Sequence, residues 1–274
     1  MSAERESFLA RLRAGEPQLG LSAMYPCPAV IERVGADWDW IWVDGQHGQF
    51  GYQDLLAAVR ACDLVKRPAF VRVPWHEPGS IGQALDMGAA GVIVPCIDTL
   101  AEAQTAAAAA KFPSLGRRSY GGRRVIDREG RGYSDSANDQ TLLIVQIESP
   151  QAIENAAEIA AVPGVDGLFL GPDDVMLRRG YAMTTPRSAQ TLGRDLQTVA
   201  DACKAHGKIA VSVGIGAEML SLCLSMDYTL ICAGGDTMFL SNGSKSASSE
   251  ARELIAGKKC PEEACVSAKI SSPY

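Results

Sequence analysis

Eight short runs rich in Val, Ile, Leu and aromatic residues recur along the chain, and segments with helical periodicity lie between most of them. The predicted strands are 19–24, 40–43, 69–73, 91–95, 142–147, 167–170, 209–213 and 228–232. The predicted helices are 52–62, 80–87, 99–110, 153–161, 188–206 and 217–225. Such alternation is typical of parallel strands joined by helical crossovers, and a length of 274 residues suits a closed barrel better than an open sheet with an added domain. We therefore predict an α/β fold with a single (β/α)8 TIM barrel.

The two ends of the chain are predicted to lie outside the barrel repeat. Residues 3–13 form a predicted helix that carries Phe8, Leu9 and Leu12 on one face, and we expect it to cap the floor of the barrel. Residues 241–246 are rich in Ser, Asn and Gly and are interpreted as a linker before a short helix at 250–256. The predicted organisation is a barrel domain at 1–242, followed at 243–274 by the serine-rich linker, the short helix and a flexible tail.

Composition limits the possible partners and the compartment. The chain is 47% apolar and 21% charged, its formal charge of −6 comes from intermixed acids and bases, and no long basic run is typical of a nucleic-acid binder. No apolar stretch approaches the roughly 20 residues of a membrane span. The polar opening residues do not resemble a secretory leader, so we expect a soluble, cytoplasmic protein without membrane or nucleic-acid partners. Eight cysteines without close CxxC pairs are expected to be reduced and mostly buried, although Cys260 and Cys265 lie in a polar tail.

Charged residues that follow apolar runs are the first candidates for chemistry, because barrel enzymes place their active sites at the carboxyl ends of the strands. Glu148 and Asp174 follow two successive predicted strands, which would bring their carboxylates together at the rim. Oxygen ligands of this kind suit a hard divalent cation, with Mg²⁺ or Mn²⁺ as the best fit. The alternative interpretation is two solvated loop acids.

Two further polar residues follow the second and third predicted strands. Arg72 can clamp a carboxylate or enolate oxygen with its planar set of donors, or it can form a structural ion pair with Asp44 or Glu148. His47 is the best candidate for a general base, and a buried structural histidine is the competing interpretation. None of these predicted strand ends carries a lysine, which disfavours an imine mechanism.

The segment Gly171-Pro172-Asp173-Asp174 offers backbone N–H groups at Gly171, Asp173 and Asp174, near the predicted metal site. Such donors can hold a small carboxylate, although a plain turn explains the same residues. The glycines at 214–216 and 234–236 complete no nucleotide-binding pattern, so nucleotide binding has little support.

Five ordered motifs resemble the HpcH/HpaI aldolase family, which comprises metal-dependent pyruvate aldolases of the phosphoenolpyruvate/pyruvate barrel superfamily, with macrophomate synthase-like relatives. The motifs are Val43-Asp44-Gly45-Gln46-His47-Gly48, Val71-Arg72-Val73-Pro74-Trp75, Leu85-Asp86-Met87-Gly88-Ala89, Val145-Gln146-Ile147-Glu148 and Leu170-Gly171-Pro172-Asp173-Asp174. The resemblance covers roughly residues 19–240.

The resemblance implies a role for each of these positions. Glu148 and Asp174 would bind the metal, which is Mg²⁺ or Mn²⁺ with Co²⁺ as a further possibility, and Arg72 would hold the keto and enolate oxygen. His47 would handle the proton, and Asp86 would orient the catalytic histidine, across a subunit contact. The implied substrate-binding residues are Gln46, Trp75, Gly171, Pro172 and Asp173.

The implied reaction is reversible cleavage of a 4-hydroxy-2-oxo acid into pyruvate and an aldehyde, with the cation as Lewis acid. A homo-oligomer, and specifically a hexamer, is the family expectation. Oxaloacetate decarboxylation, or enolate transfer as in macrophomate synthase-like enzymes, is the first alternative, and a non-catalytic barrel that binds a keto acid is the second. Gln46, Met176, the stretch 119–131 and the serine-rich segment after Asp236 depart from the family pattern and leave substrate and assembly open.

Overall fold

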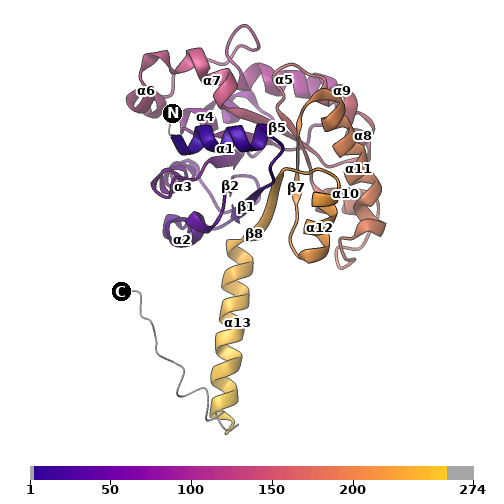
Figure 1. Cartoon of the computed structure of the whole chain (residues 1–274). Coiled ribbons are helices and arrows are strands. Elements are labelled where there is room, and N and C mark those ends of the chain that lie inside the picture. The colour runs from indigo at the N-terminus through magenta and orange to yellow at the C-terminus, as the bar shows by residue number, and fades with distance from the viewer. Residues whose placement is uncertain (1–2, 258–274) are drawn as a thin grey trace. The chain divides into compact units, whose positions relative to one another are not determined.

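The computed structural model describes residues 3–257, and its eight parallel strands pair in chain order until β8 closes on β1 (Figure 1). The strands are β1 (Gln18–Ala23), β2 (Trp40–Asp44), β3 (Ala69–Arg72), β4 (Gly91–Val94), β5 (Leu142–Ile147), β6 (Gly167–Leu170), β7 (Ile209–Val213) and β8 (Leu230–Gly235). Each coincides with a predicted strand to within three residues at either end. The predicted (β/α)8 TIM barrel is therefore confirmed.

Apart from α1, which precedes β1, the helices follow the strands and cover the outside of the barrel, as Figure 1 shows. They are α1 (Ala3–Arg13), α2 (Pro28–Val34), α3 (Tyr52–Leu64), α4 (Pro78–Asp86), α5 (Leu100–Ala110), α6 (Arg123–Glu129), α7 (Ser134–Gln140), α8 (Pro150–Glu154), α9 (Ala156–Ala160), α10 (Pro172–Arg178), α11 (Ala189–His206) and α12 (Ala217–Ser225). The helix predicted at 153–161 is split into α8 and α9. The short helices α2, α6, α7 and α10 were not predicted, because segments of seven residues show little periodicity.

Two separate apolar cores hold the barrel together. Strand side chains alternate between the inside of the barrel and the surrounding helices, so each strand contributes to both cores. Inside the barrel, the aromatic residues Trp40, Phe70 and Phe169 pack in one cluster with Phe8 and Leu12 of α1. The predicted role of the first helix as a cap on the barrel interior is thus confirmed.

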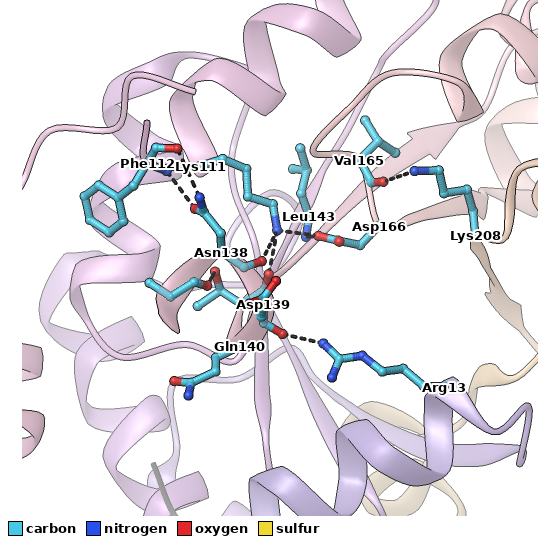
Figure 2. A network of polar contacts seen from close by, with 12 residues as sticks. Arg13, Lys111, Phe112, Asn138, Asp139, Gln140, Leu143, Val165, Asp166 and Lys208 are labelled. Carbon is cyan, nitrogen blue, oxygen red and sulfur yellow. Dashed lines mark hydrogen bonds and ion pairs between the residues drawn. The ribbon is translucent and has the colours of Figure 1, made fainter. Parts of the chain in front are cut away.

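A buried lysine organises the amino-terminal end of the barrel (Figure 2). The side chain of Lys111 is 1% exposed, and its ammonium group donates to Asp166 Oδ2 at 2.7 Å and to the carbonyl oxygens of Asn138 and Thr141 at 3.0 and 2.8 Å. Asp166 Oδ2 also accepts from Leu143 N at 2.7 Å. Burial of the charge is therefore offset by several charge-assisted hydrogen bonds, which join α5 to the starts of β5 and β6.

The other lysines of the described barrel also lie at or near its amino-terminal end. Lys66 precedes β3, and Lys204 and Lys208 lie at the end of α11 and directly before β7. No lysine among described residues 3–236 therefore lies at the carboxyl end, where the predicted site residues are found. A Schiff base needs a lysine amine beside the substrate, so the statement that an imine mechanism is disfavoured stays a prediction.

The contacts divide the chain after Asp236, which is the first residue of α13 (Asp236–Ile255), and the second unit contains the rest of that helix. Residues 241–246 lie inside this helix, so the predicted linker is wrong, and the predicted short helix at 250–256 is the end of a helix of 20 residues. Ser and Asn lower helix propensity only by tenths of a kcal/mol (about 0.5 each), and no proline interrupts the segment. The predicted flexible tail, with Cys260 and Cys265, lies outside the described residues.

The described cysteines are free thiols, as predicted. Four are buried, Cys96 is half-buried and Cys27 is exposed. Within residues 3–257, no helix combines the length and the apolar character needed to cross a membrane.

Candidate active site

Asp44 and Arg72 form a buried ion pair at the carboxyl end of the barrel. They end β2 and β3 and are partners in the strand register, which places both side chains on the inner face, two residues beyond Trp42 and Phe70. Arg72 Nε donates to Asp44 Oδ1 at 2.9 Å, and Arg72 Nη2 donates to Asp44 Oδ2. Of the alternatives for Arg72, the structure therefore contains the pair with Asp44.

Two more contacts fix the Arg72 guanidinium. Its Nη1 donates to Gln146 Oε1 at 3.4 Å, and its central carbon lies 4.7 Å from the centroid of the Trp42 ring. A guanidinium has five N–H groups, and three of them are used by these partners. Two N–H groups are left to bind an anionic oxygen, held in place by contacts that resist rotation of the side chain.

Asp44 also shapes the loop that carries His47. Asp44 Oδ1 accepts hydrogen bonds from Gln46 N at 3.0 Å and from His47 N at 3.2 Å, while Gly48 N donates to the Asp44 carbonyl oxygen at 3.1 Å. A Cβ atom at Gly48 would lie 2.3 Å from that oxygen, so only glycine fits. The resulting turn leaves His47 exposed, which rules out a buried structural histidine. Gln46 Oε1 is buried and has no hydrogen-bond partner among the described residues.

Glu148 follows β5 and is 1% exposed. Its Oε1 accepts from Cys96 N at 2.8 Å and from Cys96 Sγ at 3.0 Å. Burial is the largest cause that raises the pKa of Glu148, and the nearby Asp174 carboxylate raises it too, whereas the hydrogen bonds from Cys96 act in the opposite direction. A second carboxylate close enough to perturb Glu148 is what the predicted metal site requires.

The backbone at Gly171 lies directly against the Glu148 carboxylate. A Cβ atom at this position would be 2.9 Å from Glu148 Oε2 and 2.7 Å from Gln146 Nε2, so glycine keeps this space open. The N–H of Gly171 donates to the Ile147 carbonyl oxygen at 3.0 Å. The prediction that this N–H binds a substrate carboxylate is therefore wrong, because it completes the hydrogen bonding between β5 and β6.

The remaining residues of this segment lie on α10. Pro172 is buried at the start of the helix, Asp174 is half-buried, and Asp173 is exposed. The Asp173 carboxylate accepts from Arg187 Nε at 2.8 Å and from Arg187 Nη2 at 2.6 Å, so its side chain is held in an ion pair with Arg187. Met176 is buried among the side chains between the strands and the helices, not in the barrel interior.

Trp75 lies in the loop after β3 and is 45% exposed. Its ring is 5.0 Å from that of His76, measured between centroids. Trp75 is three residues beyond Arg72, the last residue of β3, so it is also at the carboxyl end of the barrel. An exposed aromatic side chain in that position can cover a bound ligand.

The carboxylates of Glu148 and Asp174 suit a divalent cation whose remaining ligands are water or substrate oxygens. Among residues 3–257, no three His, Cys, Asp or Glu side chains are arranged to hold a metal by themselves. Glu148 and Asp174 would therefore supply two ligands, and water or substrate oxygens would supply the rest, as is common for Mg²⁺ and Mn²⁺. The space kept open by Gly171 next to Glu148 Oε2 fits this arrangement.

Asp86 lies far from His47 of the same chain. It is the last residue of α4, which runs from the carboxyl end of β3 back to the amino end of β4, whereas His47 follows β2 at the carboxyl end. Asp86 Oδ1 accepts from the buried Arg118 at 2.7 Å, on the wall of an arginine-rich pocket of about 970 Å³ between α3, α4, α5 and α6. One chain alone does not bring Asp86 and His47 together.

Three polar residues next to the site were not singled out from the sequence. Gln146 was noted only inside a motif, and Asp44 only there and as a possible ion-pair partner of Arg72, although alternation along β2 and β5 places both on the inner face. Cys96 was counted only as a buried thiol, and its contact with Glu148 depends on a loop conformation that the sequence does not indicate. A fourth residue, Asp236, anchors the first loop, because its Oδ2 accepts from Met24 N at 2.9 Å and Tyr25 N at 3.0 Å.

Comparison with known proteins adds an independent observation. Residues 27–242 match the family model described as HpcH/HpaI aldolase/citrate lyase. The chain is 31% identical over 263 residues to the 4-hydroxy-2-oxo-heptane-1,7-dioate aldolase of Shigella flexneri, covering 90% of this chain and 97% of that protein. It is 38% identical over 177 residues to a 4-hydroxy-2-oxovalerate aldolase of Novosphingobium aromaticivorans, covering 64% and 68%. A crystal structure of an HpcH/HpaI aldolase/citrate lyase family protein from Burkholderia cenocepacia J2315 superposes with a TM-score of 0.80 at 30% identity, covering 90% and 99%.

Proposed function

Because this chain belongs to the HpcH/HpaI aldolase/citrate lyase family, we propose that it cleaves a 4-hydroxy-2-oxo acid reversibly into pyruvate and an aldehyde. One observation carries the proposal: Arg72, held by Asp44 and Gln146, has free N–H donors at the same end of the barrel interior as the Glu148 carboxylate. A cationic donor and metal-ligating carboxylates are the groups that stabilise an enolate.

Glu148 and Asp174 are the proposed ligands of a divalent cation, Mg²⁺ or Mn²⁺, with Co²⁺ as a further candidate. When bound, the cation acts as a Lewis acid that lowers the energy of the developing pyruvate enolate. The high desolvation cost of the buried Glu148 carboxylate supports this role, because a positive charge next to it would offset that cost.

Arg72 is proposed to bind the 2-oxo oxygen, which gains negative charge as the carbon–carbon bond breaks. Its guanidinium is already oriented by Asp44, Gln146 and the Trp42 ring, so little reorganisation is needed during the reaction. The pair with Asp44 does not prevent this role, because two N–H groups face no described acceptor.

His47 is proposed to take the proton from the 4-hydroxyl group of the substrate. Its exposed imidazole lies on a loop fixed by Asp44, and an imidazole nitrogen can accept a proton from a substrate within hydrogen-bond reach. The proposed partner that orients it is Asp86 of a second copy, because Asp86 of the same chain lies at the other end of the barrel. A homo-oligomer is therefore part of the proposal, with a hexamer as the family expectation.

The proposed pocket for pyruvate and the aldehyde lies between the loops after β2, β3 and β6. Gln46 offers a buried oxygen without a partner among the described residues, and Trp75 offers an exposed aromatic surface. Pro172 and the backbone N–H of Asp173 line the start of α10 on the other side of Glu148.

Pyruvate release tests this function. We would measure it with a lactate dehydrogenase-coupled assay from 4-hydroxy-2-oxo acids and from oxaloacetate, with chelated enzyme and after addition of Mg²⁺ or Mn²⁺. The expected result is metal-dependent release from hydroxy-oxo acids, lost in Glu148→Gln and kept in Glu154→Gln, which changes an exposed acid on α8. Faster release from oxaloacetate than from any hydroxy-oxo acid, above the background caused by the metal, would favour a decarboxylase, and no release from either would refute an enzymatic role.

A further inference from the structure

Cys96 adopts a backbone conformation that residues other than glycine rarely adopt. It follows β4 with a φ of 56°, in the left-handed region, where a side chain crowds its own backbone. Only two other described non-glycine residues have a positive φ: Lys66 and Asp227, both at the amino end of the barrel. Such conformations persist where neighbouring contacts stabilise them, and they are common at functional sites.

The contacts of Cys96 explain what this conformation achieves. It turns both the backbone N–H and the thiol toward the same atom, Glu148 Oε1, at 2.8 and 3.0 Å. The Arg178 guanidinium, at the end of the helix that begins beside Gly171, is close enough to lower the pKa of the Cys96 thiol, although burial and the Glu148 carboxylate raise it more. Cys96 therefore contacts Glu148 and lies near the end of α10, the helix that carries Asp174.

The two oxygens of Glu148 are therefore in different surroundings. A carboxylate oxygen has two lone pairs, and both lone pairs of Oε1 are occupied by the two donors from Cys96. Oε2 accepts no hydrogen bond from a described residue and lies against Gly171, where a side chain would fill the space. Only Oε2 is left with free lone pairs.

We propose that Cys96 is a positioning residue for Glu148: its thiol and backbone N–H together occupy Oε1, so that Glu148 binds the divalent cation through Oε2 alone. The inference rests on the proposed metal-dependent function, and it extends that function to the coordination mode and to a residue outside the ligand set. The thiol acts as a hydrogen-bond donor in this role, not as a nucleophile or a metal ligand.

Substitutions at position 96 separate the thiol from the backbone, because the backbone N–H remains in every variant. Cys96→Ala removes the side-chain donor and should weaken Mn²⁺ binding about tenfold, as loss of a group that orients a metal ligand commonly does. Cys96→Ser keeps an O–H donor at a similar distance and should stay within about threefold of the wild-type Kd. Cys223→Ala, which removes a buried thiol of α12 far from the site, is the matched control and should leave the Kd unchanged.

Cys96→Gly separates positioning from a purely structural role. Glycine relieves the left-handed conformation, so the metal-free protein should unfold within about 3 °C of wild type, while Mn²⁺ binding should still weaken as in Cys96→Ala. A residue that only stabilised the loop would lower the melting temperature and the metal affinity together.

The experiment is a titration of the full-length, metal-free protein with Mn²⁺, followed by electron paramagnetic resonance of free Mn²⁺, with the melting temperature of each variant measured in parallel. A wild-type Kd for Cys96→Ala, or an equal loss in Cys96→Ala and Cys96→Ser, would overturn the inference. Glu148→Gln distinguishes the two levels of the proposal, since unchanged Mn²⁺ binding in that variant would refute the metal site itself.

Discussion

The substitution Arg72→Lys tests whether Arg72 serves catalysis or only pairs with Asp44. The two side chains are 7% and 1% exposed, so removal of the positive charge would leave a buried carboxylate unpaired at a cost of about 3–5 kcal/mol. Lysine keeps the charge and can still contact Asp44, so the variant should fold, with a loss of stability of roughly 1–2 kcal/mol from the broken bidentate contact.

The expected loss of activity is much larger than the loss of stability. A single ammonium that pairs with Asp44 cannot also reach Gln146 and the substrate, so a donor to the developing oxyanion is lost. Removal of one such donor commonly costs about 2.7–4 kcal/mol, so kcat should fall by about 10² to 10³ at saturating Mn²⁺.

The assay is lactate dehydrogenase-coupled pyruvate release, with the melting temperature as the measure of folding. Arg33→Lys, at an exposed position on α2, is the control and should match the wild type in both measurements. If Arg72→Lys keeps kcat within threefold of the wild type while folded, the ion pair with Asp44 is the whole role of Arg72, and the proposed mechanism is refuted.

Three other changes give distinct outcomes. Gly171→Ala places a methyl group 2.9 Å from Glu148 Oε2 and should reduce the free energy of unfolding by about 1–3 kcal/mol. It should also weaken Mn²⁺ binding in a calorimetric titration, and unchanged binding would contradict the proposed position of the cation. Lys111→Met leaves the Asp166 carboxylate without its ion-pair partner and should lower the free energy of unfolding in urea by about 2–3 kcal/mol. The cost is smaller than for a fully buried pair because the Asp166 side chain is 26% exposed. The kcat should stay unchanged, and a large loss of kcat would contradict the structural role of the lysine. Alkaline pH should destabilise the protein, because burial raises the pKa of the four buried thiols, which therefore stay protonated when folded and ionise when unfolded. At pH 9.5 the stability should be about 6 kcal/mol lower than at pH 7, with about 1.4 kcal/mol from each thiol, and a melting temperature that does not fall over this range would contradict it. The four thiols are Cys62, Cys203, Cys223 and Cys232.

The barrel was predictable because its strands are short apolar runs buried on both faces. The runs at 142–147, 167–170 and 209–213 have the same bounds as β5, β6 and β7. Positions after such runs also predicted where Glu148, Arg72 and His47 lie, since strand ends of a parallel barrel meet at one rim. The sequence therefore located the candidate site without any information about its internal contacts.

Contacts that depend on side-chain direction or on loop conformation were not predictable in the same way. The sequence left two possible ion-pair partners for Arg72, Asp44 and Glu148. The register of β2 and β3 places Asp44 beside Arg72 and so decides between them. The N–H of Gly171 was expected to bind substrate, but the hydrogen bonding of β6 with β5 uses it. The contact of Cys96 with Glu148 requires a left-handed backbone that a cysteine gives no reason to expect.

The helix α13 shows a different limit. Serine, asparagine and glycine at 241–246 are typical of a linker, but helix-propensity costs of about 0.5 kcal/mol for each Ser or Asn and about 1 kcal/mol for Gly243 do not stop a helix that contains no proline. Asp86 illustrates the same limit for function, because its local sequence carries no sign of a catalytic role and its own chain does not bring it to His47.

A crystal structure with Mn²⁺ and oxalate, a planar mimic of the pyruvate enolate, would test the central claim most directly. The account predicts anomalous density for Mn²⁺ between Glu148 Oε2 and Asp174, with Glu148 Oε1 still bound to Cys96 and an oxalate oxygen in hydrogen-bond contact with Arg72. Mn²⁺ bound elsewhere, or oxalate that makes no contact with Arg72, would contradict it.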